Sequence, residues 1–148
     1  MDHPNAHHYR TTHDALWDRL DIEPLFEWFT DDVQWTNDIG AGPFHRFDGK
    51  AAVLSFFEQW TNLFDGGFRH ELIDVCASDT NIIAILREVG TARGHTFDNL
   101  ALYRYQLDDS GRIVSVRTFD QDRESIVQFW EAIDFAGGLT GQSGSAQS

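Results

Sequence analysis

Two residues in this sequence could move a proton near neutral pH, and each lies in a segment expected to be a strand. Asp120 closes the last such segment, where Thr118, Val116 and Val114 share its side because strand side chains alternate. A carboxyl group at the edge of an apolar cavity has a raised pKa, which suits a general acid or base. A structural alternative is that Asp120 caps a terminal helix beginning near Asp122.

The second proton-transfer candidate is His70. It shares the parity of Phe68, Leu72 and Cys76 on an earlier predicted strand. The ordinary pKa of histidine, about 6.5, allows it to exchange a proton at physiological pH. A hydrogen-bonded core or rim histidine is the competing interpretation.

Four further side chains are candidates for holding a ligand by hydrogen bonds. If Asn99 points inward, Tyr103 does too, and its phenol could stabilise an enolate-like oxygen. Asn37 and Asn99 are expected to orient a carbonyl or hydroxyl group, and His13 faces the same opening from the first helix. The alternatives are backbone bonding for the amides, core packing for Tyr103 and an exposed helix position for His13.

The aromatic content is high, with five Trp and twelve Phe in 148 residues. This indicates a bulky core, an aromatic-lined cavity, or both. The aromatic residues expected in the cavity wall are Trp17, Trp35, Phe57 and Trp60.

No cofactor is expected, because glycine-rich phosphate loops and nucleophile elbows are absent from the sequence. No metal site is expected either. His3, His7 and His8 are close in sequence, but they fall in a predicted N-terminal tail, where adventitious binding is the better interpretation.

The hydrophobic pattern predicts the elements that position these residues. Apolar spacing of three to five residues indicates helix, and Pro24 divides the first helical stretch into two. Short alternating runs rich in β-branched residues indicate strands, and Asp108 to Gly111 form a hairpin turn. The predicted helices span 8–30, 49–64 and 124–133, with Gly66-Gly67 ending the second, and the strands span 33–37, 68–77, 81–92, 95–107 and 112–120.

Helices followed by consecutive hairpin-linked strands predict an α+β fold with helices on one face of a curved antiparallel sheet. We expect a flexible tail over residues 1–7, one domain over 8–136 and a disordered Gly/Ser/Gln-rich tail over 137–148. The outer face of such a sheet is often a dimer contact, so a homodimer is expected.

The net charge of the protein limits the kinds of partner that it can bind. Eleven basic and 24 acidic residues give a net charge of −13, which repels nucleic acid and anionic membranes. No apolar run is long enough to span a bilayer or to act as a secretion signal. The single cysteine, Cys76, agrees with a reducing compartment, so a cytoplasmic location is expected.

The motifs DIEPLFEWFTDDV (21–33), WTNDIGAGP (35–43), GKAAV (49–53), FDN (97–99) and GRIVSVRTFD (111–120) resemble one known family. This is the nuclear-transport-factor-2-like superfamily, in its SnoaL-like and ketosteroid-isomerase-like branch. The resemblance covers roughly residues 8–135 and implies a cone-shaped fold enclosing an apolar pocket. It does not single out an activity, because the superfamily hosts several.

The resemblance also suggests roles. The acid/base aspartate of SnoaL-type cyclases corresponds to Asp120. In ketosteroid isomerases the catalytic aspartate falls on Asn37, which cannot serve as a base, while the oxyanion-hole aspartate falls on Tyr103 and a helical tyrosine on His13. Limonene epoxide hydrolases use a Tyr-x-Asn pair and an Asp-Arg-Asp relay. Here Trp35 replaces the tyrosine, and no Asp stands two residues after Arg87.

These observations favour a cofactor-independent general acid/base enzyme acting on a hydrophobic, oxygenated small molecule by cyclisation, isomerisation, or hydration and dehydration. One alternative is a non-catalytic binder that uses the same pocket. An epoxide hydrolase and a protein–protein adaptor are less favoured.

Overall fold

The computed structural model describes residues 2–38 and 45–133. The expected turn at 40–43 and the tail at 137–148 lie outside the described residues. Four helices and six strands follow in the order α1 Pro4–Arg19, α2 Glu23–Trp28, β1 Phe29–Thr36, β2 Arg46–Asp48, α3 Lys50–Leu63, β3 Asp65–Ala77, β4 Asn81–Ala92, β5 His95–Leu107, β6 Ile113–Asp120 and α4 Arg123–Ile133.

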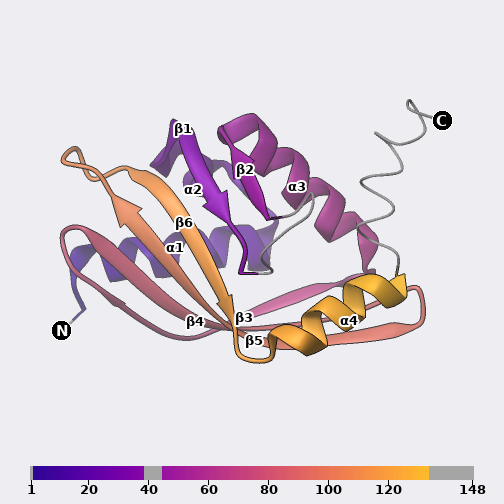
Figure 1. The fold of residues 1–148 in the computed structure, drawn as a ribbon. Coiled ribbons are helices and arrows are strands. Elements are labelled where there is room, and N and C mark those ends of the chain that lie inside the picture. The colour runs from indigo at the N-terminus through magenta and orange to yellow at the C-terminus, as the bar shows by residue number, and fades with distance from the viewer. Residues whose placement is uncertain (1, 39–44, 134–148) are drawn as a thin grey trace.

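The six described strands form one sheet in the order β2-β1-β6-β5-β4-β3 (Figure 1). Helix α3 contacts β1 and β2 at one edge of the sheet and β3 at the opposite edge. A flat sheet could not bring its two edges to the same helix, so the sheet is strongly curved. Helix α1 packs on β3 and α4 on β5 and β6. The predicted α+β fold with helices on a curved sheet is therefore confirmed.

One neighbouring pair in the sheet is parallel. Strand β1 runs parallel to β6 and antiparallel to the short strand β2, whereas β3 to β6 are antiparallel throughout. The expected all-antiparallel sheet is wrong at this pair. Hairpins force antiparallel pairing only between strands joined by tight turns, and most of the chain separates β1 from β6. Strand β2 was not predicted.

Several expected boundaries also differ. Helix α1 begins at Pro4, so residues 4–7 are helical rather than part of a tail. The Nδ1 atom of His3 accepts a hydrogen bond from the backbone N–H of Asn5 at this helix start. The chain enters β1 at Phe29, before the predicted helix end at residue 30. Gly66 and Gly67 do not end α3 but lie within β3, at positive φ in an irregular part of the ladder.

Turn chemistry follows the sequence closely. Arg93 and Gly94 both have positive φ and join β4 to β5, the geometry of a tight type I′ hairpin. The predicted turn between β5 and β6 is confirmed, because the Asp108 carboxylate accepts hydrogen bonds from Ser110 and from the backbone of Arg112.

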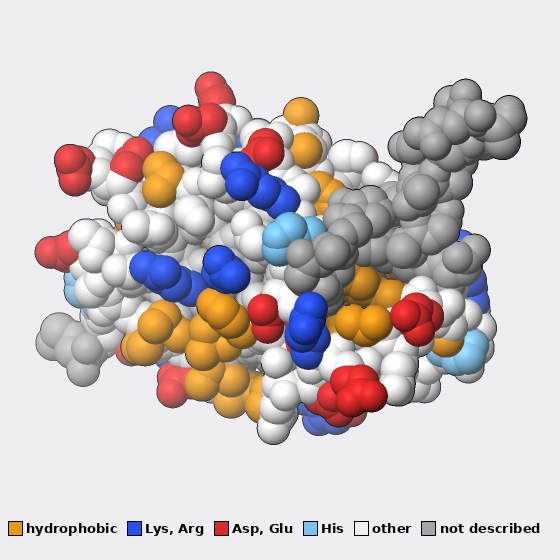
Figure 2. All heavy atoms as spheres, viewed as in Figure 1, with side chains coloured by type: hydrophobic (Ala, Val, Ile, Leu, Met, Phe, Trp, Pro, Cys, Tyr) orange, Lys and Arg blue, Asp and Glu red, His pale blue; other side chains and the backbone are white. Residues whose placement is uncertain are grey.

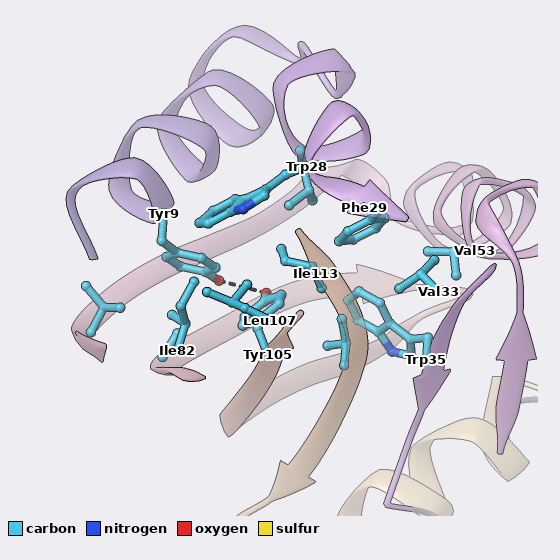
Figure 3. Close-up of a cluster of buried hydrophobic side chains, with 14 of the residues drawn as sticks. Tyr9, Trp28, Phe29, Val33, Trp35, Val53, Ile82, Tyr105, Leu107 and Ile113 are labelled. Carbon is cyan, nitrogen blue, oxygen red and sulfur yellow. Dashed lines mark hydrogen bonds between the residues drawn. The ribbon is translucent and has the colours of Figure 1, made fainter. Parts of the chain in front are cut away.

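The core fills the space between the helices and the inner face of the sheet (Figure 3). Phe29, Val33 and Ile113 have no exposed surface, and each such side chain contributes about 1.5–3 kcal/mol through burial. The hydroxyl groups of Tyr9 in α1 and Tyr105 in β5 lie 2.9 Å apart and share one hydrogen bond. This contact joins α1 to the middle of the sheet. Among the described residues, no helix is both long and apolar enough to cross a membrane.

Candidate active site

An apolar cavity lies between α1, α3, α4 and the inner face of the sheet. It offers about 80 Å³ to the centres of water-sized molecules, well above the 10–15 Å³ or so that one water needs. The aromatic residues predicted for its wall come from α1, α3 and β1. Trp17, Trp35, Phe57 and Trp60 all line it.

A buried carboxylate organises the inner wall of this cavity. Glu88 on β4 has a side chain only 8% exposed. Its Oε2 accepts hydrogen bonds from the Tyr103 hydroxyl at 2.7 Å and from His70 Nε2 at 3.1 Å, and its Oε1 accepts one from Asn99 Nδ2 at 3.0 Å. Three donors on one carboxylate compensate the cost of burying its charge.

The hydrogen bond to Glu88 fixes the ring of His70. Because a carboxylate only accepts, His70 Nε2 carries the hydrogen, and His70 Nδ1 shares a second hydrogen bond with His13 Nε2 at 3.1 Å. Burial, together with the neighbouring His70, lowers the pKa of His13 to about 4, against the opposing effect of Asp14. His13 is therefore neutral near pH 7, and both ring nitrogens of His70 are engaged.

Asp120 stands at the end of β6, half-buried at the edge of the cavity. Burial raises its pKa to about 6. A hydrogen bond from Asn99 opposes this shift, the charges of Glu88 and Asp38 add to it, and Arg123 opposes it more weakly. Asn99 Nδ2 donates to Asp120 Oδ1 at 2.8 Å and also to Glu88, so the amide bridges the two carboxylates.

Asp122, not Asp120, caps the start of α4. Asp122 Oδ1 accepts a hydrogen bond from the backbone N–H of Ser125 at the start of α4. Asp120 Oδ1 instead faces Asn99.

A second polar group is centred on Asn37, just after β1. Its Oδ1 accepts hydrogen bonds from Trp35 Nε1 at 2.9 Å and from the Thr118 hydroxyl at 3.0 Å. Asn37 is buried beside β6, as expected for the residue that replaces the isomerase base.

All ten side chains predicted for the site line this one cavity. The expected parity on β5 holds, because Phe97, Asn99, Ala101 and Tyr105 are buried. On β3 the parity fails beyond Leu72. The register shifts between Leu72 and Asp74, so Val75 is buried and Cys76 exposed. At the start of β6, Ile113 rather than Val114 is fully buried, again beside a register shift.

The main residue missed from sequence is Glu88. A signal was present, because Glu88 shares the parity of Ile82, Ala84 and Leu86, all fully buried. A carboxylate that continues such an apolar series is expected to face the interior and to need partners. Arg87 points outward and pairs with Asp98.

The arrangement provides one group suited to proton transfer. No group of three or more His, Cys, Asp or Glu side chains able to hold a metal ion occurs in residues 2–38 and 45–133. The cavity presents one half-buried carboxyl group whose pKa lies near neutral, with an amide donor fixed beside it. Such a group can both accept and return a proton.

Comparison with known families agrees with this architecture. The model of the SnoaL-like domain matches residues 9–116, which is most of the chain. The protein therefore belongs to the SnoaL-like family. Among curated proteins, no sequence match is found.

Solved structures show the same fold at low sequence identity. Bal32a, from a soil-derived mobile gene cassette, is 23% identical with a TM-score of 0.75, over 85% of this chain and 95% of its own. TerC, co-crystallised with polyporic acid, is 20% identical with a TM-score of 0.70, over 87% and 99%. An NTF2-like protein from Burkholderia pseudomallei is 19% identical with a TM-score of 0.68, over 84% and 95%.

Proposed function

We propose that this protein is a cofactor-independent general acid/base enzyme acting on a hydrophobic, oxygenated small molecule. The observation that carries the proposal is the position of Asp120. Its carboxyl group lies at the edge of an aromatic-walled cavity, and burial raises its pKa to about 6. A pKa near the working pH gives a group that is effective in both directions of proton transfer.

In the proposed reaction the Asp120 carboxylate removes a proton from the ligand and later returns it at another position. Asn99 donates to Asp120 Oδ1 and keeps the carboxylate oriented. Isomerisation and cyclisation of this kind conserve the atoms of the substrate. Dehydration uses Asp120 twice: its carboxylate removes a proton from the carbon next to the one that bears a hydroxyl group, and the resulting acid donates that proton to the hydroxyl group, which departs as water while the double bond forms.

The remaining polar residues support Asp120. His70 and Tyr103 direct their hydrogens to Glu88, so we assign them to holding Glu88 and Asn99 in place. Cyclase-like chemistry agrees best with the position of Asp120 at the end of β6. The co-crystallisation of TerC with polyporic acid supports a small-molecule ligand for this fold. The epoxide-hydrolase alternative loses support, because Arg87 lies on the outer face.

Proton exchange in D₂O tests this function. Ligands would first be found by titrating tryptophan fluorescence with oxygenated aromatic and alicyclic compounds. Each bound ligand would then be incubated with the enzyme in D₂O and followed by NMR and mass spectrometry. We expect exchange or product formation with the natural protein and, at saturating ligand, a loss of about 10²–10⁴-fold in turnover for Asp120→Asn.

Asp98→Asn is the matched control, because it removes an aspartate charge from the outer face of the neighbouring strand. It should keep full turnover. Tight binding with no exchange and no product in the natural protein would reject the enzyme and establish the binder. Unchanged turnover in Asp120→Asn would reject the role of Asp120.

We also propose that the outer face of the sheet forms a homodimer. Ile83, Ile85, Leu100 and Phe119 are at least a third exposed, and the ladder places Ile85, Leu102 and Phe119 side by side across three strands. Figure 2 shows apolar side chains gathered on the molecular surface. An apolar group of this kind marks a protein contact. Sedimentation should give a dimer that Ile85→Arg dissociates, and a natural protein that is monomeric at high concentration would contradict it.

We place this protein in the cytoplasm, where an exposed lone thiol such as Cys76 stays reduced.

A further inference from the structure

The hydrogen bonds of the cavity restrict which ligands fit beside Asp120. On β5 and β6 the donors of Asn99, Tyr103 and Thr118, which line the cavity, are already directed at protein acceptors, and the hydroxyl of Tyr105 pairs with that of Tyr9. Both N–H groups of Asn99 donate to carboxylates, the Tyr103 hydroxyl donates to Glu88, and the Thr118 hydroxyl donates to Asn37. His70 Nε2 likewise donates to Glu88.

The groups left to a ligand at this wall are acceptors. Asp120 uses only Oδ1 in its bond to Asn99, and among the described residues Asn99 Oδ1 accepts no hydrogen bond. The oxygen of Tyr103 donates its hydrogen to Glu88 and keeps lone pairs. A carbonyl oxygen placed here would meet acceptor oxygens only.

Charge acts in the same direction. Glu88 and Asp120 are both acidic, and none of the described residues that line the cavity is Lys or Arg. His13 is neutral near pH 7, because burial lowers its pKa to about 4. A ligand carboxylate beside Asp120 would therefore meet like charge in a poorly solvated space.

We propose that the cavity selects uncharged apolar compounds that present a hydroxyl group to Asp120, and that it discriminates against their ethers and against carboxylates. The inference rests on the proposed function, in that the same cavity receives the ligand. It narrows the substrate to a neutral alcohol, phenol or enol. The hydroxyl donates to the free oxygen of Asp120, which is also the geometry from which its proton can be taken.

Three naphthalene probes of nearly one shape test this selectivity by isothermal titration calorimetry at pH 7.5. 2-Naphthol carries a donor, 2-methoxynaphthalene replaces it with a methyl ether, and 2-naphthoate carries a negative charge. We expect 2-naphthol to bind at least tenfold more tightly than either of the others, because a hydrogen bond to a charged group is worth about one factor of ten or more. The ether buries one more methyl group, so a cavity that only takes up apolar surface would prefer it.

The Asp120→Asn variant is the matched control, since an amide can donate as well as accept. In this variant the preference for 2-naphthol over the ether should shrink to about threefold or less, and 2-naphthoate should gain affinity. Phenol, anisole and benzoate provide a smaller series with the same expected order.

Equal binding of naphthol and ether, tightest binding of naphthoate, or no binding in either series would each overturn the inference. The measurement is independent of turnover. A non-catalytic binder would still show the selectivity, and an enzyme that fails this test would keep its proton exchange in D₂O.

Discussion

Strands β4 and β5 carry acidic residues on both faces, and the two faces use them differently. On the outer face, Arg87 donates to both oxygens of Asp98 at 2.9 and 3.1 Å, with the two side chains 51% and 50% exposed. On the inner face, the next residue along β4, Glu88, is almost fully buried and accepts three hydrogen bonds. Two adjacent residues of β4 therefore have different roles: Arg87 forms a solvated ion pair, and Glu88 is a buried acceptor that joins three side chains.

Two aspartates make the same contrast in proton affinity. The hydrogen bond from Arg87 lowers the pKa of Asp98, whereas burial raises the pKa of Asp120 to about 6. Asp98 is therefore fixed as an anion in water, while Asp120 can change its charge near neutral pH. The environment of each face, not the residue type, decides which acid can do chemistry.

The largest expected effect comes from removing the buried carboxylate of Glu88, and it is an effect on stability. Glu88→Ala leaves the hydrogens of His70, Tyr103 and Asn99 without their acceptor, and we expect a loss of about 3 kcal/mol in the free energy of unfolding. Urea denaturation followed by tryptophan fluorescence measures it. Arg87→Ala is the outer-face counterpart and should change the midpoint very little, because exposed ion pairs contribute little. Similar losses for the two variants would contradict the contrast.

The pH dependence of stability is expected to contain two opposing parts. The folded pKa of His13, about 4, lies below its ordinary value of 6.5, so the stability it contributes is lost as pH falls from 6.5 through 4. The folded pKa of Asp120, about 6, lies above its ordinary value of 3.8, so its contribution is present below 3.8 and lost as pH rises through 6.

Unfolding free energies of the natural protein and two variants, measured from pH 4 to 7, separate these parts. The unfolding free energy of the natural protein minus that of Asp120→Asn should fall by on the order of 2 kcal/mol as pH rises from 4 to 6. The corresponding difference between the natural protein and His13→Gln should rise by a similar amount over the same pH range. Two difference curves with the same slope would show that one of the burial assignments is wrong.

Two buried tyrosines sharpen the comparison within the inner face. Tyr103 donates to the charged Glu88, whereas Tyr105 shares a bond with the neutral hydroxyl of Tyr9. We expect Tyr103→Phe to cost about 2 kcal/mol and Tyr105→Phe about 1 kcal/mol, since bonds to charged groups are stronger. Denaturation curves of both variants test this order, and a larger loss for Tyr105→Phe would reverse it.

The smallest effect belongs to the outer pair. A double-mutant cycle of Arg87→Gln and Asp98→Asn should give a coupling close to the measurement error at physiological salt. A strong, salt-insensitive coupling would contradict the description of Arg87 and Asp98 as a solvated pair, because desolvated charges interact more strongly.

The sequence alone could predict those parts of the site that depend on local periodicity. Strand alternation placed Asn99, Tyr103 and Asp120 on one face, because the ladders joining β4, β5 and β6 are largely regular. It failed at Cys76, where a bulge between Leu72 and Asp74 reverses the parity without any mark in the sequence.

The contacts between distant elements could not be predicted in this way. The His13–His70 hydrogen bond requires α1 to cross the inner side of β3, and the parallel pairing of β1 with β6 joins segments far apart in the chain. Both depend on tertiary packing, which leaves no local pattern. Glu88 is different, because strand alternation predicts that it faces the interior and only its hydrogen-bond partners cannot be predicted.

The titration of the Asp120 carboxyl carbon by ¹³C NMR tests the central claim most directly. The signal would be assigned by its absence in Asp120→Asn and followed from pH 3 to 8 in the ligand-free protein. We predict a midpoint near 6, well above the ordinary value of 3.8. A midpoint at or below 3.8 would contradict the claim, because Asp120 would then be an ordinary solvated carboxylate.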